Sequence, residues 1–225
     1  MKQKQSGFTL IEIAIVLVII GLLLGGALKG QELINSAKVK NLATDFKNIP
    51  VYIYGYQDKF RALPGDDKAA NDHVGAAAAE IGNGNGVIDG AWNSEVANVE
   101  SYMFWEHVRL AGLATGSTTQ GATDYVPVNA SGGTIGIMSG TTDLTKAAIN
   151  DGTNAIRGSY VICSSGILGK FVKQLDLQMD DGNTAGGSMM ATPVTGYAVG
   201  TQAATAAKAT ADIDGAASYI VCMGV

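Results

Sequence analysis

An uninterrupted apolar stretch near the amino terminus constrains this chain more than any other feature. Residues 8–28 read FTLIEIAIVLVIIGLLLGGAL, and only Thr9 and Glu12 among them are polar. At 1.5 Å per residue, a helix of this length measures about 31 Å, which matches the hydrocarbon thickness of a bilayer. The stretch therefore predicts a transmembrane or assembly helix over residues 8–28.

The residues ahead of this stretch allow a simpler interpretation. Residues 1–7, MKQKQSG, carry Lys2 and Lys4 as their only charges, as a secretory signal or a plain membrane anchor does. Two features argue against a cleaved signal. The apolar stretch exceeds the roughly 7–15 residues of a signal core, and no small-x-small cleavage site follows it. Because lysines flank both ends of the stretch, charge does not decide its orientation.

Glu12 needs an explanation, because it is a carboxylate within an apolar helix. Such a group costs about 2.5–3.5 kcal/mol at the centre of a membrane-spanning helix and somewhat less near its end, so it is normally paired. If the chain is cut after Gly7, the new terminal amine of Phe8 lies four residues before Glu12. The amine and the carboxylate then pair within one helix or between neighbouring helices, and the sequence leaves both arrangements open.

The sequence SGFTLIE at residues 6–12 resembles the cleavage and methylation signature of type IV pilins and of the pseudopilins of type II secretion. The resemblance implies that a prepilin peptidase removes the leader, residues 1–7, and methylates the Phe8 amine. It also implies that Glu12 pairs with the amine of a neighbouring subunit. An inner-membrane assembly platform would then build a homo-oligomeric helical filament from lipid-embedded precursors whose leader is cytoplasmic.

Beyond Lys29 the apolar residues become periodic. They recur every three or four residues, as on one face of an amphipathic helix, at Leu42, Phe46, Ile49, Ile53, Tyr56 and Phe60. We therefore expect a stem helix over residues 29–62 that continues the apolar helix. Pro50 should bend it, because proline removes one main-chain hydrogen bond and crowds the preceding turn.

A globular head is expected over residues 63–225, where Gly, Thr, Ser, Asn and Ala become frequent. Helices are predicted at Glu95–Ala111 and Gly169–Met179. Strands are predicted at Asp124–Val128, Thr134–Met138, Ser159–Cys163, Thr195–Val199 and Tyr219–Met223. The expected fold class is α+β, with a long N-terminal α-helix packed on an antiparallel β-sheet head.

The chain has two cysteines, Cys163 and Cys222, and both fall in predicted strands. In an oxidising envelope compartment, a disulfide between them would stabilise the fold by roughly 4 kcal/mol in the chain-entropy model. Such a bridge also resembles the one that staples the C-terminal region of many pilins. We therefore expect a disulfide rather than two free thiols.

Charge and residue order argue against two classes of function. The formal net charge is −5 and no two Lys or Arg residues are adjacent, so the electrostatic footprint of nucleic-acid binding is missing. The only histidines are His73 and His107, and no Ser-His-Asp order, carboxylate dyad or Cys-His pair stands out. We therefore expect no enzyme and no catalytic residues.

The segment IGNGNGVIDG at residues 81–90 resembles half of a calcium-binding loop. Oxygen atoms recur at alternate positions, those of Asn83, Asn85, the Val87 carbonyl and Asp89. Ile81 and Trp92, however, stand where the first ligand and the bidentate Glu of such a loop belong. A plain Gly-Asn turn is the favoured alternative, and no cofactor other than calcium is expected.

A second acidic cluster follows the helix predicted at Gly169–Met179. It comprises Asp176, Asp180, Asp181 and Asn183, where a turn at the helix end is favoured over a metal site.

The sequence thus predicts a structural subunit of a type IV pilus-like filament. A pseudopilin of a type II secretion system or a minor pilin at the filament tip remains an alternative, because the signature is common to all three. A membrane-anchored envelope protein that binds a ligand and never polymerises is a more distant one. The expected locations are the bacterial inner membrane for the precursor, and a surface pilus or a periplasmic pseudopilus after assembly.

Overall fold

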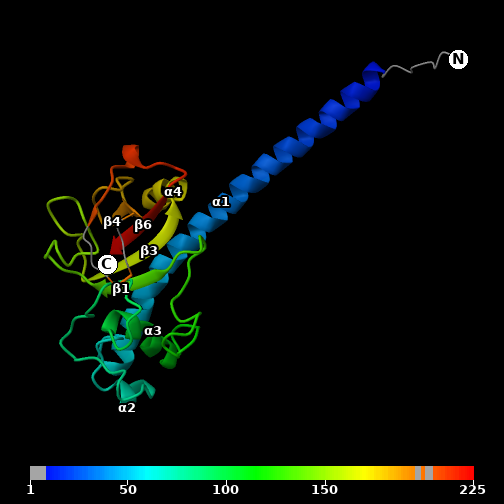
Figure 1. Ribbon diagram of the computed structural model, residues 1–225. Coiled ribbons are helices and arrows are strands. Elements are labelled where there is room, and N and C mark those ends of the chain that lie inside the picture. Colours follow the sequence, from blue (N-terminus) through cyan, green and yellow to red (C-terminus); the bar gives the residue numbers. More distant parts are fainter. Residues whose placement is uncertain (1–8, 196–198, 201–204) are drawn as a thin grey trace. The chain divides into compact units, whose positions relative to one another are not determined.

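The computed structural model describes residues 9–195, 199–200 and 205–225 (Figure 1). By their internal contacts these residues form two units, one ending at Lys38 and the other running from Val39 to Val225. Helix α1, Leu10–Phe60, contributes to both units. Gly7 and Phe8, the residues of the predicted cleavage site, lie outside the described residues.

In the first unit, α1 is an exposed apolar helix. Leu10 is 93% exposed and Leu22 is 74% exposed, and every side chain from Leu10 to Lys29 is open to its surroundings. The helix glycines of this part, such as Gly21 and Gly25, have no neighbouring atoms within 4 Å of the position a Cβ would take. Nothing within the unit covers this apolar surface.

In the second unit, one face of α1 is part of the hydrophobic core. The buried residues keep the predicted spacing of three or four: Val39, Leu42, Ala43, Phe46, Ile49, Ile53 and Tyr56. The helix continues through Pro50, with Ile49 and Ile53 buried on either side of it. It ends at Phe60, because Arg61 adopts a left-handed conformation with φ of 57°.

The helix face packs against a four-stranded antiparallel sheet (Figure 1). The strands lie in the order β1-β3-β6-β4, with bounds Ile135–Ser139, Tyr160–Leu168, Ser218–Gly224 and Met189–Pro193. A short parallel pair, β2 (Ile149–Asn150) and β5 (Thr205–Ala206), forms a second sheet. The expected α+β fold, a long helix on an antiparallel sheet, is confirmed.

The helices of the head partly match the prediction. Helix α4 has the predicted bounds, Gly169–Met179. Helix α3 spans Glu100–Leu110, so the predicted start at Glu95 is wrong. The helix cannot extend backwards, because Asn98 has a positive φ of 64° and Val99 is extended. Two short elements complete the set, α2 (Ala70–Val74) and the 3₁₀ helix η1 (Thr210–Asp212).

One strand prediction is wrong and another cannot be compared, because residues 196–198 lie outside the described part of the chain. Asp124–Val128 forms no strand, and only Val128 makes an isolated bridge, because the backbone turns here and the Tyr125 N–H donates to the Ala122 carbonyl at 3.0 Å. The predicted strand Thr195–Val199 falls largely outside the described residues, and the fourth strand of the sheet is β4, which the sequence did not predict. Its residues MMATP do not alternate between apolar and polar, since four of the five are buried.

The disulfide joins two neighbouring strands in the centre of the sheet. Cys163 on β3 and Cys222 on β6 are directly opposite each other in the antiparallel register, and their sulfur atoms are bonded at 2.05 Å. Both cysteines are fully buried. The bridge thus links the middle of the chain to its final strand.

We predict that replacing both cysteines, by Cys163→Ala and Cys222→Ala, lowers the free energy of unfolding by roughly 2–5 kcal/mol, because the unfolded chain regains the entropy of the open loop. Denaturant unfolding of the full chain in detergent measures this. A reductant should lower the stability of the wild type to that of the variant and leave the variant unchanged. Equal stability of the oxidised wild type and the variant would contradict the prediction.

Candidate functional site

The start of α1 forms a capping box between Thr9 and Glu12. The Thr9 N–H and the Thr9 hydroxyl both donate to Glu12 Oε2, at 2.8 and 2.7 Å. The Glu12 N–H lies 3.4 Å from Thr9 Oγ1 and donates to it in return. The carboxylate also stands in the first turn of the helix, where the helix dipole favours a negative charge.

This arrangement gives Glu12 a partner within its own chain, Thr9, which the sequence analysis did not consider. The sequence contains the pattern of a capping box, Thr-x-x-Glu, directly before an apolar run. The Thr9 N–H and the Thr9 hydroxyl both donate to Glu12 Oε2. Glu12 Oε1 takes part in neither of these two hydrogen bonds. Pairing of Glu12 with a Phe8 amine stays a prediction, because Phe8 lies outside the described part of the chain.

The helix that follows this cap has the length and composition of a membrane span. Among the described residues, α1 is the one helix that is long and apolar enough to cross a membrane. No residue of its most apolar stretch is buried in the protein. The apolar surface is therefore free to contact lipid or other helices.

The comparisons with known proteins point to this same segment. The prokaryotic N-terminal methylation motif matches residues 2–28, and this motif is the signature of type IV pilins and pseudopilins. No curated protein matches the chain. No solved structure matches it either.

The motif supports a pilin-like or pseudopilin protein and points to a structural subunit rather than an enzyme. The motif and the N-terminal apolar helix are consistent with a precursor anchored in the inner membrane. The motif implies processing by prepilin peptidase and assembly into a filament.

The Gly-Asn segment of the head folds around the carboxylate of Asp66. Three main-chain N–H groups donate to Asp66, those of Gly84 (2.6 Å), Asn85 (3.0 Å) and Gly86 (2.7 Å). Gly84 and Gly86 have φ of 74° and 85°, a region that favours glycine, so the N–H groups can converge on one anion. Asp66 is only 3% exposed, and the sequence analysis did not single it out.

The residues considered for calcium bond to one another in this segment. Asp89 Oδ2 accepts the side-chain amides of Asn83 (3.2 Å) and Asn85 (3.0 Å). The amide oxygen of Asn85 accepts the Val87 N–H at 2.8 Å. Glu100, at the start of α3, accepts the N–H groups of Asn83 and Asp89, both at 2.9 Å. These bonds give the turn a structural explanation, and calcium binding by these residues stays a prediction.

The two histidines are both held by hydrogen bonds inside the head. His107 is fully buried; its Nδ1 accepts the Gly65 N–H, and its Nε2 donates to the Glu80 carbonyl, both at 2.9 Å. Burial lowers the pKa of His107, so the ring is neutral. His73 Nδ1 lies 2.7 Å from Asp67 Oδ2. Both rings tie loops to helices.

Asp67 is the centre of a second cluster of buried polar side chains. Its Oδ2 also accepts the hydroxyl of Tyr56, from α1, at 2.7 Å. Burial raises the pKa of the Asp67 carboxyl, but the bonds from His73, Tyr56 and the Ala69 N–H outweigh burial and hold the pKa below its usual value. These hydrogen bonds hold the loop after α1 against the buried face of that helix.

Glu106 on α3 carries a buried carboxyl whose pKa is raised. It is 3% exposed and accepts the Gln120 side-chain amide at 2.9 Å. Burial, together with the neighbouring carboxyl of Glu80, raises the pKa of Glu106 to about 7, although the Gln120 bond opposes this. The protonated form of Glu106 is therefore favoured by folding.

We predict that Glu106→Gln makes stability less dependent on pH. The stabilisation from protonated Glu106 is complete below its unfolded pKa of about 4.5 and is lost as the pH rises through about 7. The variant and the wild type should unfold at similar temperatures at pH 4.5, with the variant more stable at pH 8. The exposed Glu95→Gln serves as the matched control. Parallel pH profiles for wild type and Glu106→Gln would contradict the assignment.

Proposed function

We propose that this protein is a structural subunit of a type IV pilus-like filament, cut after Gly7 and assembled through its N-terminal helix. One observation carries the proposal. The methylation motif stands at the start of a helix whose apolar surface is exposed and of membrane-spanning length. A surface of this kind needs lipid or other apolar helices around it, since contiguous exposed apolar patches of this size are rare on soluble proteins.

Assembly in this proposal exchanges lipid for like helices. Lipid chains are as apolar as leucine, so the gain comes from close packing and from polar contacts between helices. Gly21, Gly25 and Gly26 have no side chain and nothing lies within 4 Å of their Cβ positions, so a neighbouring helix can approach the backbone closely here. The contact that fixes the axial position is the Glu12 carboxylate with the Phe8 amine of a neighbour.

The Thr9–Glu12 capping box supports this role of Glu12 in both states. Before assembly, the two Thr9 donors lower the cost of holding a carboxylate at the membrane interface. During assembly, Glu12 Oε1 is available to a neighbour's amine without breaking the cap. The Glu12 carboxylate therefore has a hydrogen-bond partner both in the membrane and during its transfer into the filament.

A pseudopilin or a minor tip pilin is the second candidate, because the methylation motif is common to these subunits. The long head rich in Gly and Thr favours a surface pilus. Imaging of sheared surface fibres from cells that express the protein separates a pilus from a pseudopilus: labelled fibres support a pilus subunit, and a subunit confined to the periplasm supports the pseudopilin.

We predict that the mature chain begins at N-methylated Phe8. Intact-mass measurement and N-terminal sequencing of the protein from its membrane should show the loss of residues 1–7 and one added methyl group. An intact Met1 would instead indicate a plain anchor. A cut beyond Leu28 would indicate a secreted protein, and either result would refute the proposal.

We predict that Glu12→Ala leaves membrane insertion and cleavage intact but strongly reduces incorporation into filaments, because the neighbour's amine loses its counter-charge. The ratio of filament-associated to membrane-associated subunit measures this. Glu32→Gln is the matched control, because Glu32 makes only an exposed ion pair with Lys29. Filaments of normal abundance from Glu12→Ala would refute the charge-pairing account.

A further inference from the structure

The chain contains two Asn-Gly pairs, Asn83-Gly84 and Asn85-Gly86, and both lie in the Gly-Asn segment of the head. Asn-Gly is the dipeptide in which deamidation is fastest, because glycine puts no side chain in the way of the reaction. The glycine main-chain nitrogen loses its proton to base and attacks the Asn Cγ, the Cγ–Nδ2 bond breaks, and ammonia leaves. Water then opens the resulting cyclic imide to aspartate or isoaspartate. Both asparagines are exposed, so water reaches them.

Asp66 holds the main-chain nitrogen that would attack in each pair. The Gly84 N–H donates to Asp66 Oδ1 at 2.6 Å, and the Gly86 N–H donates to Asp66 Oδ2 at 2.7 Å. Asp66 is 3% exposed, so its carboxylate is shielded from water. An N–H bonded to a buried carboxylate is harder to deprotonate, since the resulting anion would lie beside another negative charge. Both glycine nitrogens are therefore poor nucleophiles in the folded chain.

The side-chain amides of the two asparagines are held in matching ways. Asn83 Oδ1 accepts the Asn85 N–H at 2.9 Å, and Asn85 Oδ1 accepts the Val87 N–H at 2.8 Å. Both amide nitrogens donate to Asp89 Oδ2, at 3.2 and 3.0 Å. Each amide is thus tied at both ends, to the N–H two residues ahead and to Asp89. These bonds resist the rotation that would bring Cγ onto the glycine nitrogen.

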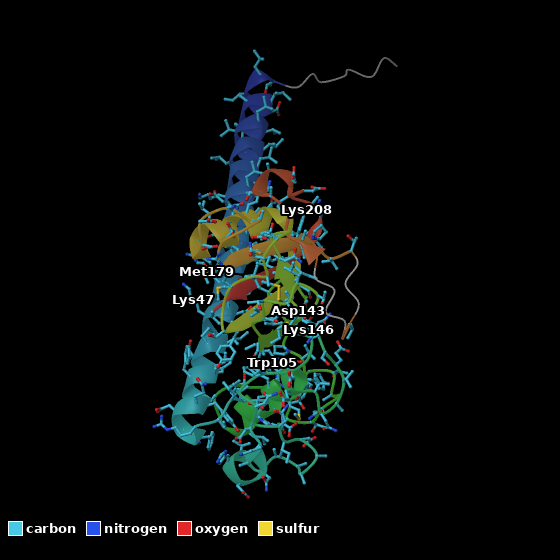
Figure 2. All side chains as sticks on the ribbon, turned by 90° about the vertical axis from the view of Figure 1, so that its left-hand side faces the viewer. Lys47, Trp105, Asp143, Lys146, Met179 and Lys208 are labelled. Carbon is cyan, nitrogen blue, oxygen red and sulfur yellow. A yellow bond between two sulfur atoms is a disulfide. The ribbon has the colours of Figure 1, made fainter. Side chains whose placement is uncertain are left out.

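The start of α3 holds the same segment from a second side. The carboxylate of Glu100 accepts the N–H groups of Asn83 and Asp89, both at 2.9 Å. The Ser101 N–H donates to the Asp89 carbonyl at 3.0 Å. Glu100 begins α3, and Trp105 of the same helix is buried in the head (Figure 2). Opening of the Gly-Asn segment therefore has to break several hydrogen bonds to buried carboxylates.

We propose that Asn83 and Asn85 are latent deamidation sites, which Asp66 keeps unreactive as long as the Gly-Asn segment stays closed. Opening of the segment releases the glycine nitrogens, and each completed reaction replaces a neutral amide by a carboxylate. The new negative charges lie next to Asp66 and Asp89, so the altered segment cannot close as before and a transient opening becomes a permanent covalent change. This inference concerns the head alone and holds whether or not the chain assembles into filaments.

The competing explanation is that the order of the loop as a whole prevents the reaction, without a special role for Asp66. Asp67 separates the two explanations. It follows Asp66 directly, is 2% exposed, and anchors the same loop through Tyr56 and His73. The remaining bond of its carboxylate is to the Ala69 N–H rather than to a glycine of the Asn-Gly pairs. Asp67→Ala therefore loosens the loop while leaving the bonds from Asp66 to both glycines in place.

The test is the deamidation rate of the full chain in detergent, at mildly alkaline pH and at a temperature where circular dichroism shows every variant to be folded. Peptide mapping by mass spectrometry measures aspartate and isoaspartate at residues 83 and 85. The wild type should react far more slowly than the same chain unfolded in urea. Asp66→Ala should raise the rate at both positions by about tenfold or more, because each reacting N–H loses its bond to a charged group. Asp67→Ala should raise it much less.

Hydrogen exchange of the wild type is a second measurement that needs no variant. The amide protons of Gly84 and Gly86 should exchange slowly although both residues are exposed, and urea below the unfolding transition should raise their exchange and the deamidation rate together. Exchange as fast as in the unfolded chain would overturn the proposal. Equal deamidation rates for wild type and Asp66→Ala would overturn it as well, and equal increases in Asp66→Ala and Asp67→Ala would do so in favour of loop order.

Discussion

The structure depends on one helix that meets two different environments. The part of α1 from Val39 to Phe60 buries one face against the sheet, and this face supplies several of the largest core residues, among them Phe46 and Tyr56. The part from Leu10 to Lys29 has no such cover. Because the backbone of α1 is continuous, the same element that organises the head also carries the apolar surface that has to find lipid or other subunits.

The head holds its long loops mainly through buried polar side chains. Its loop segments are rich in Gly and Asn and supply few apolar groups, so they cannot be fixed by hydrophobic packing alone. Asp66, Glu100 and His107 each bind main-chain groups of a loop, and each is almost completely buried. Buried polar groups of this kind are stable only when they are hydrogen-bonded, which makes the loop conformation specific. Asp176 departs from this pattern, since neither of its carboxylate oxygens is hydrogen-bonded to a described residue.

The apolar helix and the capping box together limit what the amino terminus can do. A span of this hydropathy inserts readily, and Thr9 satisfies one oxygen of the Glu12 carboxylate from within the same turn. The polar group is therefore tolerated at the helix end and remains able to bind a neighbour. This physical account agrees with the methylation motif at residues 2–28, which was identified independently of the geometry.

The sequence by itself determined the features that are local or periodic. These are the apolar span, the stem face with its spacing of three and four, helix α4 and the motif around Glu12, since each is encoded by neighbouring residues. The pairing of Cys163 with Cys222 also followed, because the chain has only two cysteines.

Only the tertiary structure decided the features that depend on distant partners. Strand β4 was missed because it is buried on both faces and does not alternate. Asp66 gained its role from N–H groups some twenty residues away, the separation between Asp66 and Gly86. Asp176 became notable only when α4 packed on the head and enclosed it. Burial and long-range hydrogen bonds arise from contacts between segments, and no local pattern records them.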